Sequence, residues 1–271
     1  MKSRGPGRLI IHCGVQKTAS TAFHHFLRRN HATLSQYLEI RTPTKASPTR
    51  ELGRISALYS LDDSHEVALL AHLTGLRDDL LGSDRPCLVS HENIPGAMLG
   101  RDGVVTLYPA IDRILRLFDE QLAPFEPEYV FYTRDLTRWK RSVHNQSVRS
   151  DLNSATYEQF LTDTQDCGDW ADLQARVEAV VGADRCHFLR LEDEPHKGRP
   201  GQQLLRLCGV PEDVLEGLDP VQGNRNPSLN AGALEFLRQV NALDLPIKPR
   251  TAIADLVLEN QGLFVTETGG A

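Results

Sequence analysis

Long apolar runs, an excess of positive charge and paired cysteines are all missing from this sequence of 271 residues. No stretch reaches the roughly 20 apolar residues of a membrane-spanning helix, and no signal-peptide-like run precedes the first apolar segment. We therefore expect a cytoplasmic protein without membrane insertion. Because 36 acidic residues outnumber 30 basic ones, a general nucleic-acid binder is disfavoured. Any anion-binding site must be local.

The cysteines argue against both a disulfide framework and a zinc site. None of the five belongs to a C-x-x-C pair, and three lie in apolar, strand-like runs. We expect them to be reduced core residues, and we expect no metal site. With 40% hydrophobic residues the chain can bury a substantial core, so residues 1–271 are predicted to form a single domain.

The most informative stretch is residues 8–27, RLIIHCGVQKTASTAFHHFL. It begins with an apolar run typical of a buried strand, and Gly14 then allows the chain to reverse. A helix is predicted to follow directly, with hydroxyl residues at its start. Free backbone N–H groups, these hydroxyls and the Lys17 ammonium would converge at a positive helix end, which suits a phosphate.

This loop is not the strict triphosphate loop G-x-x-x-x-G-K-[ST], because no glycine directly precedes Lys17. It resembles instead the P-K-T-G-T-T loop of sulfotransferases, with Gln16 for Pro, Ala19 for Gly and Ser20 for Thr. In that family the loop holds the 5′-phosphosulfate of 3′-phosphoadenosine 5′-phosphosulfate (PAPS). The resemblance therefore implies PAPS as co-substrate, and it implies nucleotide binding by Gln16, Lys17, Thr18, Ala19, Ser20 and Thr21.

A second segment resembles the other PAPS-binding element of this family. A strand predicted over residues 129–133 is followed by Arg134 and by a helix carrying Ser142. In the family the Arg and Ser at these places grip the 3′-phosphate. A solvated basic helix face is the competing interpretation. Further along, the loop N-R-N-P-S-L resembles that of bacterial members and makes Arg225 an additional candidate for nucleotide contact.

The segment Ser90-His91-Glu92 closes another predicted strand and resembles the S-x-E segment of bacterial sulfotransferase-like proteins. An open parallel sheet binds its ligands at the carboxyl ends of the strands, so these residues should lie near Lys17 if both strands belong to one sheet. We favour Glu92 as general base, with His91 as the alternative. Successive strand residues point to opposite faces, so only one of the two should face an acceptor. A serine-hydrolase triad is disfavoured because no G-x-S-x-G elbow is present.

These elements predict an α/β protein of P-loop type, with three αβα layers around a central parallel sheet of about four to five strands. Helices are predicted near residues 69–80, 111–122, 172–181, 199–208 and 230–241. Residues 31–65 are polar and interrupted by Pro43 and Pro48, which predicts a long loop or lid. Residues 262–271 are expected to form a flexible tail.

The implied reaction is transfer of a sulfuryl group from PAPS to a hydroxyl or amine of a small-molecule, glycan or lipid acceptor. Lys17 and the loop N–H groups would neutralise the leaving phosphate. One alternative is a P-loop small-molecule kinase, since Thr18 follows Lys17 directly and Asp135 could bind magnesium. Another is a non-catalytic nucleotide-binding scaffold, for which Gln16 and Ala19 would speak. The sequence determines neither the acceptor nor the oligomeric state.

Overall fold

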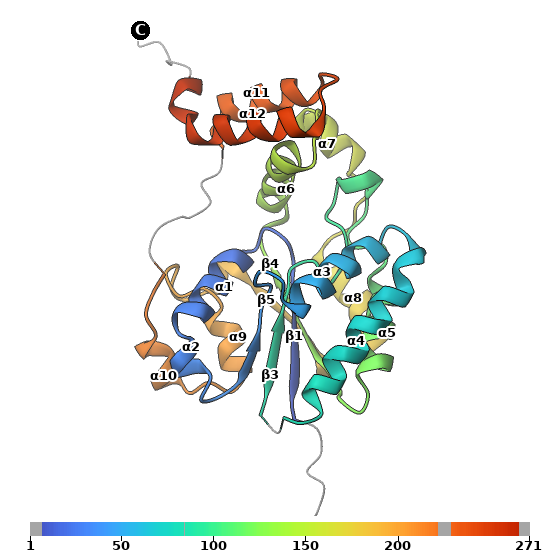
Figure 1. The fold of residues 1–271 in the computed structure, drawn as a ribbon, viewed down its shortest axis with the longest axis vertical. Helices are drawn as coiled ribbons and strands as arrows, with labels where there is room; N and C mark the ends of the chain where they lie inside the picture. Colours follow the sequence, from blue (N-terminus) through green and yellow to red (C-terminus); the bar gives the residue numbers. More distant parts are fainter. Residues whose placement is uncertain (1–6, 84, 222–228, 266–271) are drawn as a thin grey trace, which may run out of the picture.

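A five-stranded, all-parallel sheet in the order β2-β3-β1-β4-β5 forms the middle layer of the molecule (Figure 1). The structure is a computed structural model that describes residues 7–83, 85–221 and 229–265. It confirms the predicted three-layer α/β fold and the predicted strand number. The strands are β1 (Leu9–Gly14), β2 (Glu39–Arg41), β3 (Cys87–Ser90), β4 (Glu128–Thr133) and β5 (Cys186–Arg190).

The central strand β1 is buried along its whole length, as the apolar run at its start predicts. Its side chains alternate between two cores. Leu9 and Ile11 join the cluster under one helical layer, and Ile10 joins the cluster under the other. Both faces of the sheet are therefore covered, and the strand ends remain the place where a ligand can approach.

One face of the sheet is covered by α3 (Pro48–Tyr59), α4 (Glu66–Leu80), α5 (Ile111–Leu122) and α8 (Trp170–Val181). The other is covered by α1 (Ser20–Arg29), α2 (His31–Leu34), α9 (Gln202–Leu207) and α10 (Glu212–Gly217). Short 3-10 turns cover Asp63–His65, Arg101–Gly103, Ala183–Arg185, Leu191–Asp193 and Gln261–Phe264. No helix in the described ranges has both the length and the apolar character needed to cross a membrane.

A smaller helical group stands beyond the carboxyl ends of the strands (Figure 1). It consists of α6 (Leu136–Ser150), α7 (Tyr157–Asp163), α11 (Ala231–Asn241) and α12 (Ile247–Glu259). Val148 of α6 packs against Leu237 of α11 and Val257 of α12 in a separate small core. This group forms a wall above the sheet edge, and α6 is its inner face.

The expectation that residues 31–65 form a long loop is wrong, because they contain β2 and the three-turn helix α3. Pro48 suggested a break, but it occupies the first turn of α3, where a missing N–H costs nothing. The Ser47 side chain caps the helix by accepting a hydrogen bond from the Arg50 N–H. Whether the segment acts as a lid stays a prediction. Of the predicted tail, residues 266–271 lie outside the described residues.

Candidate nucleotide and acceptor site

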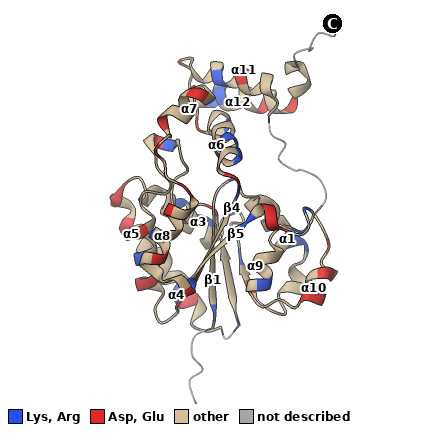
Figure 2. Cartoon of the chain, turned by 180° about the vertical axis from the view of Figure 1, so that it is seen from behind, with Lys and Arg blue, Asp and Glu red and all other residues tan. Residues whose placement is uncertain are grey.

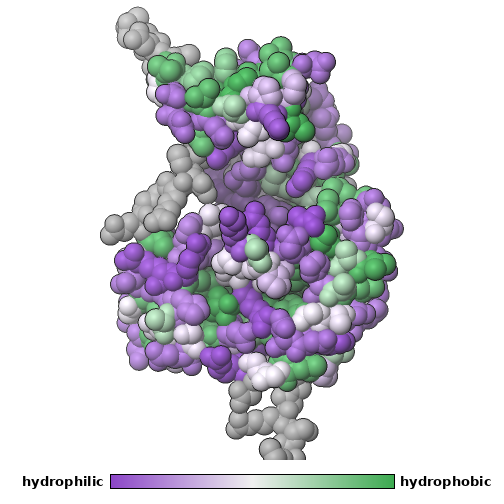
Figure 3. All heavy atoms as spheres, viewed as in Figure 1, coloured by the Kyte–Doolittle hydropathy of each residue, from purple (hydrophilic) through white to green (hydrophobic). Residues whose placement is uncertain are grey.

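A cavity of about 1,000 Å³ lies at the carboxyl ends of the central strands, under α6. Figure 3 shows a mainly hydrophilic hollow between the upper helical group and the sheet layers. The cavity brings together parts of the chain that are far apart in sequence. Its walls include Gln16, Lys17, Ala19, Ser20 and Thr21 after β1, Glu92 after β3, Arg134 after β4, and Ser142 on α6.

The loop between β1 and α1 is held in place by its own side chains and by α6. The Thr18 hydroxyl donates to the Val15 carbonyl at 2.5 Å, and the Trp139 indole N–H donates to the Gln16 carbonyl at 2.7 Å. The Gln16 amide oxygen accepts a hydrogen bond from the buried Tyr108 hydroxyl. Two of the predicted nucleotide-binding side chains, those of Gln16 and Thr18, therefore support the loop.

The start of α1 provides the free donors that an anion needs. Ser20, the first helical residue, is only 5% exposed, and its hydroxyl has no hydrogen-bond partner among the described residues. No described side chain caps this ten-residue helix, whose Ncap is Ala19. Thr21 is exposed beside it on the cavity wall. An anion seated here would satisfy the backbone N–H groups and the buried Ser20 hydroxyl together.

Ala19 adopts the left-handed conformation (φ 68°) at the position where the resembling motif has glycine. Its side chain is exposed, so Ala19→Gly loses no packing and relieves the strain of a left-handed alanine. We expect the free energy of unfolding to rise by about 0.5–1 kcal/mol, measured by urea denaturation. The matched change Ala175→Gly in the middle of α8 should lower it by about 1 kcal/mol. Equal losses in both variants would contradict the strained loop.

Two cations meet at the loop. The Lys17 ammonium donates to the Gln146 amide oxygen at 3.0 Å, and an Arg134 Nη donates to the Lys17 carbonyl at 3.2 Å. Burial lowers the pKa of Lys17, and the neighbouring Arg149 and Arg134 lower it further, whereas Glu92 opposes them. The Arg134 Nε is buried and lacks a partner within the described chain. This local concentration of positive charge in an acidic protein is where an anion would be favoured.

The C-terminal half of α6, from Ser142 on, lines the cavity, and Figure 2 marks the lysine and arginine positions of the helix. Ser142 is where the sequence placed it, and Asn145, Gln146 and Arg149 extend the same face at three, four and seven residues beyond it. The sequence interpretation missed these three residues. The helical spacing from Ser142 was the signal that could have found them.

The two candidate bases at the end of β3 differ in whether they line the cavity. Glu92 lines the cavity, and its buried Oε2 has no hydrogen-bond partner in the described part of the chain. His91 is 6% exposed, is not one of the described lining residues, and accepts a hydrogen bond at Nδ1 from the Asn93 N–H. Burial lowers the pKa of His91. Of the pair, Glu92 is the residue that faces the cavity. The predicted nucleotide contact Arg225 lies outside the described residues.

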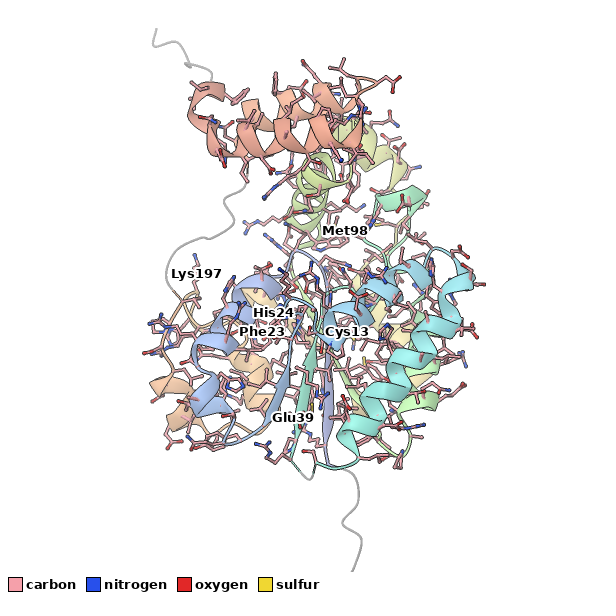
Figure 4. All side chains as sticks on the ribbon, viewed as in Figure 1. Cys13, Phe23, His24, Glu39, Met98 and Lys197 are labelled. Atoms are coloured by element: carbon pink, nitrogen blue, oxygen red, sulfur yellow. The ribbon has the colours of Figure 1, made fainter. Side chains whose placement is uncertain are left out.

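Beneath the cavity, a buried hydroxyl joins two histidines. The Ser90 Oγ lies 2.7 Å from His12 Nδ1 and 2.8 Å from His24 Nε2, and His24 projects from α1 toward the sheet (Figure 4). His12 touches Phe23 and Tyr132 edge-on, and its Nε2 has no partner among described atoms. Burial lowers the pKa of His12 to about 3 and that of His24 to about 4. Both rings are therefore neutral in the folded protein at pH 7.

This cluster should make the protein sensitive to acid. The unfolded chain takes up protons near the ordinary histidine pKa of about 6.5, whereas the folded chain does so only near 4 and 3. The stability contributed is complete above pH 6.5 and is lost as the pH falls toward 4, by about 1.4 kcal/mol per pH unit and histidine. Urea denaturation between pH 7 and 4 measures it. His24→Gln should make the free energy of unfolding less dependent on pH, whereas the control His196→Gln, at an exposed histidine, should leave that dependence unchanged. Equal pH dependence in wild type and His24→Gln would contradict this role of the cluster.

No protein-family model and no curated protein matches this chain. Among solved structures, the crystal structure of a sulfotransferase from Alicyclobacillus acidocaldarius is similar over 93% of this chain and 96% of that one. The identity is 10% and the TM-score 0.45. A likeness this distant says nothing about the chemistry of the site.

Proposed function

We propose that this protein is a PAPS-dependent sulfotransferase that transfers a sulfuryl group to a hydroxyl or amine acceptor. The observation that carries the proposal is a single cavity lined by Lys17, Ser20, Arg134 and Glu92. The buried Ser20 hydroxyl has no hydrogen-bond partner within the described chain. A bisphosphorylated nucleotide fits this set. Its 5′-phosphosulfate suits the loop and the start of α1, and the family resemblance assigns its 3′-phosphate to Arg134 and Ser142.

Different residues of the cavity have different roles in the proposed reaction. PAPS supplies the sulfuryl group when bound. Lys17, held by Gln146, and the α1 N–H groups neutralise the charge that develops on the leaving 5′-phosphate. Glu92 accepts the proton of the attacking hydroxyl or amine, because it is the carboxylate at the end of β3 that lines the cavity and its Oε2 makes no hydrogen bond within the described chain.

Two observations weigh against the kinase alternative. The Asp135 carboxylate caps α6 by accepting from the Arg138 N–H at 2.8 Å, and Asp135 is not one of the described lining residues. The Thr18 hydroxyl, which would hold magnesium in a kinase, is bound to the Val15 carbonyl. Against the scaffold alternative, the Glu92 Oε2 is buried without a hydrogen bond in the described chain, 3.8 Å from His91 Nδ1, and a bound acceptor would supply the hydrogen bond that it lacks.

Calorimetric titration with adenosine 3′,5′-bisphosphate, and with ATP plus magnesium, tests the proposal. We expect metal-independent binding of the bisphosphate that weakens by at least tenfold in Arg134→Ala, since a charged hydrogen bond contributes about 1.5–3 kcal/mol. Exposed Arg138→Ala on the same helix is the control and should leave binding unchanged. Binding of Mg-ATP alone would support the kinase, and binding of neither nucleotide would overturn the proposed function.

A further inference from the structure

The cavity has a second region that the nucleotide does not need, and this inference about it rests on the proposed function. Thr21, Ala22 and the last turn of α1 line one side, together with Leu191 after β5. The other side lies toward α3 and β3, where Glu92, Asn93 and the segment 96–98 form the wall. Because the candidate base Glu92 is on the side toward α3 and β3, the acceptor must bind on that side.

Two buried atoms of the residues that line the cavity lack hydrogen-bond partners within the described chain, namely Asn145 Oδ1 and Glu92 Oε2, which lies 3.8 Å from His91 Nδ1. Both are acceptors, and both residues line the same cavity. A buried polar atom left without a partner destabilises a protein, so the pair calls for a ligand that brings at least two hydrogen-bond donors. One donor would be the reacting group at Glu92, and the other would lie near Asn145.

The remaining wall is polar. Beyond Asn145, α6 contributes Arg149 and Ser150, and Asp151 follows, with Arg101 opposite. No described lining residue is Phe, Tyr or Trp, and the apolar lining consists of small side chains together with Met98, Leu191, Val221 and Leu229. Figure 4 labels Met98 below α6. A flat phenol or an alkyl chain would be recognised by aromatic or continuous apolar walls. This end offers neither.

We propose that the acceptor is a carbohydrate, with one sugar hydroxyl facing Glu92 and a second donating to Asn145. In the reaction, the first hydroxyl oxygen forms a bond to sulfur as the bond from sulfur to the 5′-phosphate oxygen breaks. The hydroxyl proton passes to the Glu92 carboxylate and then to solvent. The products are a sugar sulfate and adenosine 3′,5′-bisphosphate. The cavity volume of about 1,000 Å³ is at the upper end for one small ligand, which leaves room for both substrates.

The test uses wild-type protein with ³⁵S-labelled PAPS and four acceptor classes. These are sugars (glucose, N-acetylglucosamine, lactose and trehalose), phenols (4-nitrophenol and 2-naphthol), decanol, and a tyrosine-containing peptide. We expect transfer to at least one sugar at a kcat/KM at least tenfold above that of every other class. No transfer to any sugar, or faster transfer to another class, would overturn the inference. Failure to bind adenosine 3′,5′-bisphosphate would overturn the proposed function instead.

A variant separates the role of Asn145 from that of the nucleotide site. Asn145→Leu keeps the side-chain size but removes the acceptor atom, so the KM for the sugar should rise at least tenfold. The dissociation constant for adenosine 3′,5′-bisphosphate should change less than twofold, which also reports that the variant is folded. Gln165→Leu, an amide-to-leucine change at an exposed residue outside the cavity, is the matched control. An unchanged KM in Asn145→Leu would remove Asn145 from the acceptor site.

Discussion

Replacing Glu92 by Gln should lower kcat for sulfuryl transfer by about 10²–10⁴-fold, the usual contribution of a general base. The amide keeps the shape of the carboxylate but cannot take the proton of the attacking hydroxyl. Of the polar residues at the end of β3, Glu92 lines the cavity, whereas His91 is packed behind it. Transfer from labelled PAPS to the sugar identified by the acceptor panel measures the loss.

Binding of the product nucleotide distinguishes a lost base from a damaged site. Adenosine 3′,5′-bisphosphate should bind Glu92→Gln within about twofold of wild type, because the amide keeps the shape of the side chain and the Glu92 Oε2 makes no hydrogen bond to the loop in the described structure. The same substitution at exposed Glu158 on α7 should leave kcat unchanged. If His91→Gln binds nucleotide normally but loses turnover, while Glu92→Gln retains it, the two roles are reversed.

The elements predicted best are those whose local pattern decides their structure. β1 begins with an apolar run and β4 is rich in aromatic and β-branched residues, and α5 repeats Ile111, Ile114, Leu115 and Phe118 at helical spacing, which buries one stripe. β2 and α3 were missed for a non-local reason. β2 has three residues and exists through its pairing with β3, and the apolar face of α3 is buried by α4 and β3. Neither partner can be read from the segment itself.

The site shows the same division. Lys17, Ser20, Arg134 and Ser142 follow from two short motifs, and the fold brings all four to one cavity. The support for the loop could not be predicted, because its partners Tyr108 and Trp139 come from distant segments. The buried histidine cluster could not be predicted from the sequence either, because it depends on the parallel register that places His12 beside Ser90.

Gly14→Ala should be the most destabilising single substitution considered for this loop, with a loss of at least about 3 kcal/mol of unfolding free energy. Gly14 has φ +81°, which disfavours any side chain, and an added Cβ would lie 2.5 Å from Glu92 Cα and 2.8 Å from Glu92 Cβ. The first contact is with backbone, so no rotation of a side chain can relieve it. The turn after β1 and the end of β3 must move apart.

Gly209→Ala isolates the contribution of the clash. Gly209 follows α9 as an exposed C-cap glycine with nearly the same φ, +87°, but an added Cβ there meets no described atom within 4 Å. Its variant should lose about 1 kcal/mol, the cost of the left-handed conformation alone. Urea denaturation of both variants measures the difference, and equal losses would mean that Glu92 is not pressed against Gly14. Because the same contact sets the position of Glu92 relative to Lys17, any folded Gly14→Ala protein should also lose turnover.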